Sequence, residues 1–274
     1  SSGANALDTA KRVKAEIDPM QRGTLIHYVL EMILSDIGTK KLSTLEYKEI
    51  KKLVDKYIAV YFDEHMSSVK DKNKRFDYNY KRLSKLIYDV VNHLAIEFKT
   101  CDFEAKAFEM SIDKDGEVKP EVLPLEDGGT IQIRGSIDRV DLFEHDGTKY
   151  VRVVDYKSGN KKFKLADIID GLNLQMFVYL FSLCGDKNSK LNGVPAGVLY
   201  MHASRNIINF DSLNEAQKNL DSEENDMFKM NGVVLADDDN LVAEAMEHKL
   251  EGKHIPVSLK SNGDIKGSLA SLEQ

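Results

Sequence analysis

Two extended segments on either side of an Asp-Gly turn form the centre of this chain. The first, GGTIQIRGSIDRVDLFEHDG, ends at Asp146 and Gly147, and KYVRVVDYKSG runs back from that turn. An Asp-Gly pair between two such segments favours a tight hairpin. The pairing that follows places Asp138 roughly opposite Asp155, and Lys157 leaves its strand on the same face as Asp155. Two carboxylates and one ammonium are therefore expected at the same end of neighbouring strands.

This group of charges has two interpretations. Facing carboxylates repel each other, so that one takes up a proton unless a cation lies beside them. Mg²⁺ prefers oxygen ligands, and a lysine next to it can hold a water molecule or help to deprotonate it. The alternative is a salt bridge between Asp and Lys on a solvated face of the sheet.

The rest of the chain predicts helices before the hairpin and mixed structure after it. Apolar residues recur at three- and four-residue steps over 22–38, 43–61 and 83–98, with Gly38 ending the first helix and Ser43 capping the second. Strands are predicted over 101–112 and 193–203, and helices over 174–183 and 241–250. The expected fold class is α/β (α+β), built around one sheet.

Length and composition suggest one domain and a soluble location. We expect a frayed segment over 1–21 and a single domain over 22–274, with a helical part over 22–100, a sheet core over 101–205 and an extension over 206–274. The sequence has no apolar run of about 20 residues and no signal pattern at its beginning. The expected location is the cytoplasm, with no membrane partner.

The charge balance bears on nucleic acid as a partner. The chain has 38 Lys and Arg against 45 Asp and Glu, a net charge of −7. Such a balance argues against a protein that coats nucleic acid, although it leaves room for an enzyme that gathers carboxylates around a metal. Lys157, Lys161, Lys162 and Lys164 form a local basic stretch, which either steers phosphate or is a solvated loop.

Three further features accompany the hairpin. His27 lies on an apolar helix face, where a histidine is either a core residue, a metal ligand or a phosphate contact. Gln175 and Tyr179 are four residues apart on one helix face, where they either line a site or belong to an ordinary amphipathic helix. Glu109 is a polar residue within a predicted strand, and by itself reads as a solvent-facing carboxylate.

Taken in order, these motifs resemble one known family. G-x-x-x-H ending at His27, a strand Glu, G-x-I-D-R-x-D from Gly135, V-D-Y-K-S from Val154 and Q-x-x-x-Y from Gln175 follow the motif order of the RecB-like branch of the PD-(D/E)XK nucleases. The segments 195–203 and 228–247 resemble the nuclease domain of AddB-type subunits of bacterial AddAB helicase–nucleases. The resemblance implies a restriction-endonuclease-like core, with a central mixed sheet flanked by helices and an N-terminal helical annex.

The resemblance also implies roles for individual residues. Those implied to bind Mg²⁺, with Mn²⁺ as a substitute, are His27, Asp138, Asp155 and the backbone carbonyl of Tyr156. Lys157 is implied to orient or activate the attacking water, and Gln175 and Tyr179 to contact the strand being cut. Glu109 is a supporting residue, with Glu104 as its alternative. Arg139 and Asp141 fit the motif, and we expect structural pairing from them.

The implied activity is that of a Mg²⁺-dependent exodeoxyribonuclease. It would hydrolyse phosphodiester bonds of single-stranded DNA, which an AddA-like helicase subunit unwinds during double-strand-break processing and recombinational repair. Alternatives are a catalytically silent DNA-binding or scaffolding module of the same fold, and a stand-alone Cas4-like or exonuclease V-like single-strand exonuclease. The intact Asp138, Asp155 and Lys157 argue against a silent module.

The chain departs from AddB-type sequences in its cysteines. That family usually carries an iron–sulfur cluster on four cysteines, whereas this chain has only Cys101 and Cys184, neither where a ligand is expected. We therefore expect this chain to be part of a longer parent protein, whose cluster-binding cysteines lie outside it.

Overall fold

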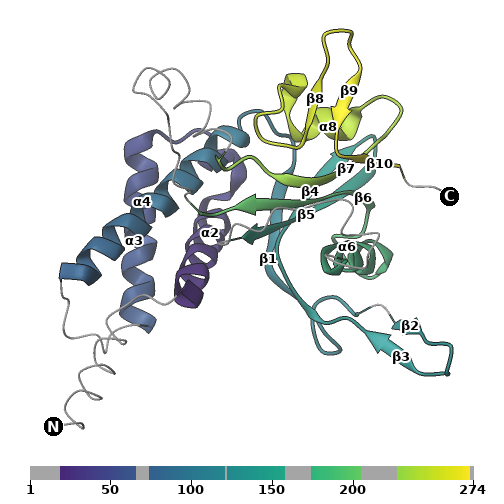
Figure 1. Ribbon diagram of the computed structural model, residues 1–274, viewed down its shortest axis with the longest axis horizontal. Helices are drawn as coiled ribbons and strands as arrows, with labels where there is room; N and C mark the ends of the chain where they lie inside the picture. The colour runs from purple at the N-terminus through teal and green to yellow at the C-terminus, as the bar shows by residue number, and fades with distance from the viewer. Residues whose placement is uncertain (1–18, 66–73, 121, 158–173, 205–226, 272–274) are drawn as a thin grey trace, which may run out of the picture. The chain divides into compact units, whose positions relative to one another are not determined.

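The computed structural model describes residues 19–65, 74–120, 122–157, 174–204 and 227–271 (Figure 1). Most of the segment predicted to be frayed, 1–21, lies outside the described residues. The chain divides into two compact units, 1–95 and 96–274. Whether they behave as one domain, as the sequence suggests, stays a prediction, and each unit is described in turn.

The described part of the first unit consists of the three predicted helices, which are confirmed. They are α2 (Pro19–Leu42), α3 (Tyr47–His65) and α4 (Lys74–Glu97), the last ending just past the unit boundary. Their apolar stripes are buried, including Ile26, Val54 and Ile87. Aromatic pairs join the helices, with ring centres 5.2 Å apart for Tyr28–Tyr61 and 4.4 Å apart for Tyr47–Tyr88.

The junction between α2 and α3 differs from the prediction at Ser43. Gly38 interrupts α2 as expected, with φ 72° and ψ 168°, but one more helical turn follows it. The predicted N-terminal cap at Ser43 is wrong, because its hydroxyl donates to the Lys40 carbonyl at 2.8 Å and so satisfies the end of α2. At the start of α3, the amide of Glu46 instead donates to the carboxylate of Glu49 at 2.9 Å.

A six-stranded mixed sheet forms the centre of the second unit, which confirms the predicted fold class. Its strand order is β1-β4-β5-β6-β7-β10, with β5 and β6 parallel and the β1–β4, β4–β5 and β6–β7 pairs antiparallel. The strands are β1 (Glu104–Ile112), β4 (Gly135–His145), β5 (Thr148–Lys157), β6 (Val194–His202), β7 (Asn231–Leu235) and β10 (Leu269–Ala270).

Smaller elements surround this sheet. The pairs β2 (Val122–Pro124) with β3 (Thr130–Gln132) and β8 (Val257–Leu259) with β9 (Ile265–Gly267) form two separate two-stranded sheets. Among the described residues around the sheet, the helices are α6 (Gln175–Gly185), α8 (Leu241–Met246) and a 3₁₀ turn, η1 (His248–Leu250). No helix in the described part of the chain is long and apolar enough to cross a membrane.

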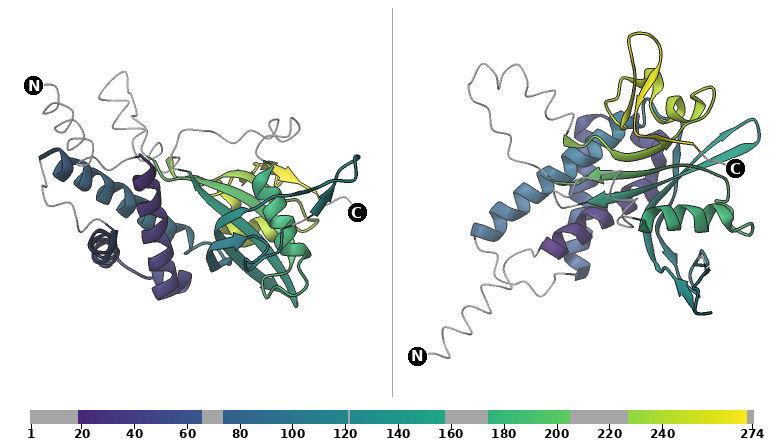
Figure 2. Two further views of the ribbon diagram at one scale, coloured as in Figure 1. Left: turned by 90° about the horizontal axis from the view of Figure 1, so that it is seen from below. Right: turned by 45° about the vertical axis from the view of Figure 1, so that its right-hand side comes forward.

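Helices cover both faces of the sheet. Met176, Leu180 and Leu183 of α6 belong to one buried cluster with Val153 of β5 and Val198 of β6. α6, coloured green, lies along this face in both views of Figure 2. α8 lies on the other side (Figure 1). We call the side covered by α6 the α6 face and the opposite side the reverse face.

The central hairpin has the predicted turn. His145 pairs with Thr148, and the two residues between them, Asp146 and Gly147, both have positive φ, at 49° and 77°. This is the backbone of a two-residue turn whose twist matches the strands. The turn fixes the register, which continues to the pair Arg139–Val154.

Gly147→Ala is expected to destabilise the second unit by about 1 kcal/mol, the cost of placing a side chain in the left-handed region. No atom lies within 4 Å of the added methyl group, so backbone conformation alone sets the effect. The measurement is the urea dependence of unfolding. Gly185→Ala is the matched control, because that site is equally open and its φ is not positive. Equal free energies of unfolding for the two variants would contradict the interpretation.

Candidate active site

Asp138 is held at the point where β4 and β5 separate. Arg139 pairs with Val154 in the antiparallel ladder, so Asp138 and Asp155 take the next facing positions, as the hairpin predicts. The Asp138 carboxylate accepts a hydrogen bond from the backbone N–H of Tyr156 at 2.7 Å. A backbone donor on the neighbouring strand thus fixes the direction of this side chain.

Asp155 and Lys157 form a close ion pair on β5. The Lys157 Nζ lies 2.6 Å from Oδ2 of Asp155. The Asp155 side chain is only 12% exposed, whereas the Lys157 side chain is 47% exposed. The carboxylate is therefore enclosed by protein, while the ammonium reaches the solvent where a substrate would arrive.

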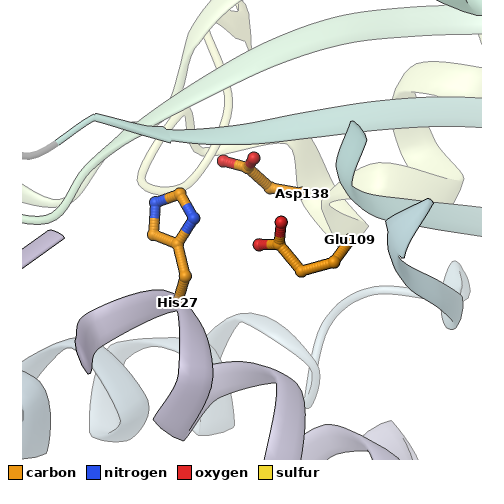
Figure 3. Close-up of side chains that lie close together, drawn as sticks. All are labelled: His27, Glu109 and Asp138. Atoms are coloured by element: carbon orange, nitrogen blue, oxygen red, sulfur yellow. The ribbon is translucent and has the colours of Figure 1, made fainter. Parts of the chain in front are cut away.

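Glu109 on β1 brings a further carboxylate to Asp138. The pairs Phe108–Arg139 and Met110–Ile137 flank them, so Glu109 and Asp138 occupy facing positions. An oxygen of each lies within 4.8 Å of the other, and Figure 3 shows both carboxylates reaching into the same space. Among the described residues, Asp155 is not in this group.

The backbone of Glu109 is strained. Its φ is 45°, which is uncommon for a residue other than glycine, above all within a strand. Glu109 also accepts a hydrogen bond from the Ser136 hydroxyl at 3.4 Å. Its sequence alternative, Glu104, pairs with Lys106 at 2.6 Å. The structure therefore associates Glu109, rather than its alternative Glu104, with Asp138.

The remaining predicted site residues lie on α2, on α6 and outside the described residues. His27 is half-buried on α2 and belongs to the first unit. Lys161, Lys162 and Lys164 lie outside the described residues. Gln175 is exposed at the start of α6 and donates a hydrogen bond to the Tyr179 hydroxyl.

Tyr179 is a buried anchor between α6 and the sheet. Its ring is fully buried, and its hydroxyl donates to the backbone carbonyl of Arg134 at 2.9 Å. The residue after Arg134 is Gly135, where a Cβ atom would lie 1.6 Å from the Tyr179 hydroxyl oxygen. The glycine that opens the G-x-I-D-R-x-D motif is thus required by the close approach of Tyr179.

Gly135→Ala is expected to destabilise the protein by about 1–3 kcal/mol, because either Tyr179 or the start of β4 has to move. Tyr179→Phe removes the clashing oxygen, so the double variant should recover part of that loss. Urea unfolding of both single variants and the double variant gives the coupling free energy. Additive effects would show that Tyr179 does not impose the glycine.

A buried charge network lies on the reverse face. Arg139 contacts Asp141 at 2.8 Å, Arg152 contacts Asp141 at 2.7 Å and Glu97 at 2.9 Å, and all four side chains are fully buried. The pairing of Arg139 with Asp141, expected from the sequence, is confirmed. Burial by itself would lower the pKa of Arg139, but Asp141, Tyr156 and Glu97 outweigh it and raise that pKa.

This network is linked to the site through Tyr156 of β5. Arg139 donates to the Tyr156 hydroxyl at 2.8 Å. The backbone N–H of the same Tyr156 holds Asp138. The reverse face therefore anchors the residue that orients a site carboxylate.

The two cysteines do not form part of the site. Both thiols are free, and desolvation raises the pKa of each to about 12. Among the described residues, neither thiol belongs to the group of side chains that could hold a metal ion.

Tyr200 on β6 is a neighbour of the site that the sequence motifs do not single out. In the parallel ladder Asp155 pairs with Tyr200, and Lys157 pairs with His202. The Lys157 Nζ lies 6.0 Å from the centre of the Tyr200 ring. The strand segment LYMHA carries these residues, but its pairing partner is not visible from the sequence.

Comparison with known proteins agrees with the motifs. Residues 4–253 match the PD-(D/E)XK nuclease superfamily. A protein of Clostridium acetobutylicum, named as one subunit of an ATP-dependent helicase/deoxyribonuclease, is 30% identical over 269 residues, 94% of this chain and 23% of the relative. The protein of the same name from Clostridioides difficile is 28% identical over 276 residues, 97% of this chain and 24% of the relative.

The chain spans about a quarter of the length of these relatives. The match to the superfamily, in contrast, extends over most of the chain and includes the hairpin with Asp138, Asp155 and Lys157. By its sequence, its mixed sheet and the carboxylates at one end of that sheet, the chain belongs to the PD-(D/E)XK nuclease superfamily.

Proposed function

We propose that this domain is a deoxyribonuclease that depends on a divalent cation and cuts phosphodiester bonds of single-stranded DNA. The observation that carries this proposal is the meeting of Glu109 and Asp138 across two strands, beside the Asp155–Lys157 pair of the next strand. Three carboxylates and one ammonium on adjacent strands suit hydrolysis of a phosphate ester.

The donor set fits a divalent cation. Like charges at facing positions of two strands destabilise a sheet, and the positive φ of Glu109 adds backbone strain. A cation bound by these carboxylates would offset both costs. Carboxylate oxygens are the ligands that Mg²⁺ and Mn²⁺ prefer.

The proposed ligands are Asp138, Asp155, Glu109, the Tyr156 carbonyl and His27. In an antiparallel ladder the N–H and C=O of one residue point to the same side. Since the Tyr156 N–H points to Asp138, its carbonyl oxygen is directed to the same edge. The proposal for His27 rests on its place in the motif order and on its half-buried position on α2.

The bound cation and the protein's own side chains would have separate roles in the reaction. A bound cation would supply Lewis-acid polarisation of the phosphate and neutralise part of its charge. Lys157 would hold the attacking water and stabilise charge on the phosphate, since its ammonium is the exposed member of the pair. The water oxygen would bond to phosphorus as the bond to the leaving sugar oxygen breaks. One proton lost by the water balances the proton that the leaving oxygen takes up, and the other stays on the phosphate product or passes to solvent.

The relatives' names support the proposed substrate and partner. A helicase activity in the same assembly would deliver single strands, so we propose an AddA-like helicase as partner and double-strand-break processing as the setting. Exonucleolytic cutting, Mg²⁺ as the physiological metal and the cytoplasm as location belong to the same proposal. Gln175, Lys161, Lys162 and Lys164 are the proposed DNA contacts, and Tyr179 is proposed to support Gln175.

Metal binding tests the proposal separately from catalysis. Asp138→Asn and Glu109→Gln should each weaken Mn²⁺ binding at least about tenfold, because each removes a charged oxygen ligand. Isothermal titration with Mn²⁺ measures this, and Glu104→Gln serves as the matched control on the same strand. Unchanged affinity in both site variants would contradict the proposal and favour a silent module of the same fold.

A further inference from the structure

Tyr200 forms a fixed surface next to a flexible lysine. The ring is 8% exposed and belongs to the cluster packed under α6, together with Val153 and Val198. Its ladder partner is Asp155. Lys157 extends past this ring, with Nζ 6.0 Å from the ring centre and its side chain 47% exposed.

An ammonium on a flexible stem needs more than one contact to stay in place. Asp155 holds Lys157 at 2.6 Å, but the same carboxylate is a proposed metal ligand. A cation bound there competes with the lysine for Asp155. The face of an aromatic ring attracts an ammonium without competing for the metal.

The chemistry of Tyr200 suits this task. A tyrosine phenol ordinarily loses its proton only at about pH 10. The ring therefore stays neutral over the pH range in which DNA is handled. A neutral ring neither binds the cation as a phenolate nor forms an ion pair with Lys157.

We propose that Tyr200 is a positioning residue, whose ring face keeps the Lys157 ammonium in the site when a divalent cation occupies Asp155. This inference rests on the proposed function and adds a residue outside the nuclease motifs. Tyr200 acts through Lys157 and does not itself contact the phosphate.

The kinetic test compares the ring with its hydroxyl. Tyr200→Leu should lower kcat for cleavage of a labelled single-stranded oligonucleotide about tenfold, the order expected of one cation–π contact. KM should stay within about twofold. Tyr200→Phe keeps the ring face and should retain wild-type kcat. Met201→Leu is the matched control, because Met201 is fully buried on the same strand and the alternation of a strand points it to the opposite face.

A second measurement needs neither metal nor activity. Acylation of Lys157 by an amine-specific reagent, followed by mass spectrometry, reports how firmly the ammonium is held in the metal-free protein. Tyr200→Leu should accelerate labelling of Lys157 about threefold relative to Lys106, and Tyr200→Phe should leave it unchanged. Thermal unfolding checks that each variant is folded, and Tyr200→Met replaces Tyr200→Leu where the latter is not.

The outcomes separate this inference from the proposed function. Wild-type labelling and kcat in the folded Leu or Met variant would overturn the inference, as would an equal loss in Tyr200→Phe, which would assign the effect to the hydroxyl. Full cleavage by both Asp155→Ala and Lys157→Ala would overturn the proposed function instead. In that case the labelling experiment still decides whether Tyr200 holds Lys157.

Discussion

Asp155→Ala and Lys157→Ala are each expected to lower the rate of single-strand cleavage about 10³-fold. Asp155 is the enclosed carboxylate at the end of β5, and Lys157 is the ammonium 2.6 Å from it. Removing one charged group that stabilises a phosphate transition state costs about two to three orders of magnitude. The measurement is release of labelled fragments from single-stranded DNA with Mg²⁺ or Mn²⁺, in the full-length protein.

The chain offers a matched control for this experiment. Glu104 and Lys106 are also two residues apart on one strand, β1, with 2.6 Å between their charged atoms, but neither belongs to the Asp138 or Asp155 motif. Lys106→Ala should therefore cleave at the wild-type rate. Undiminished cleavage by both Asp155→Ala and Lys157→Ala would remove the basis for the nuclease assignment of this site.

Asp141→Ala is expected to destabilise the protein by about 3–5 kcal/mol, the cost of breaking a buried ion pair. Asp141 contacts both Arg139 and Arg152, and all three side chains are fully buried. Without Asp141, two guanidinium groups share Glu97 and the Tyr156 hydroxyl as their remaining polar partners among the contacts described above. Urea unfolding measures the loss.

An exposed pair provides the comparison for Asp141. Lys51 and Asp55 on α3 form an ion pair at 2.8 Å, but their side chains are 59% and 52% exposed. Because water replaces the lost partner at such a site, Asp55→Ala should leave the stability nearly unchanged. A loss in Asp141→Ala no larger than that in Asp55→Ala would show that the network does not stabilise the fold.

Local patterns predict the hairpin and the first three helices well. An Asp-Gly turn of two residues fixes the register of β4 and β5, so the facing positions of Asp138 and Asp155 follow from counting residues. Helical periodicity likewise identifies α2, α3 and α4. Ser43 shows the limit of such patterns, because a hydroxyl between two helices can satisfy either end, and only the backbone geometry selects the Lys40 carbonyl.

The contacts that complete the site depend on strands distant in the sequence. The pairing of such distant strands has no local sequence signal, and this is also true of the short strands β7 and β10 at the edge of the sheet. The position of Glu109 opposite Asp138 depends on the β1–β4 register, which shifts between Ala105 and Ala107. An irregularity of one residue moves every later side chain to the other face.

The sequence by itself determined the family motifs, the hairpin and the carboxylates and lysine that it carries, because a tight turn and strand alternation are local properties. Only the tertiary structure placed Glu109 beside Asp138, Tyr200 beside Lys157 and the Tyr179 hydroxyl against the backbone at Gly135. These contacts join segments separated by loops or by a crossover helix. The register of the strands that carry these residues is set by packing of the whole sheet, which no local sequence pattern encodes.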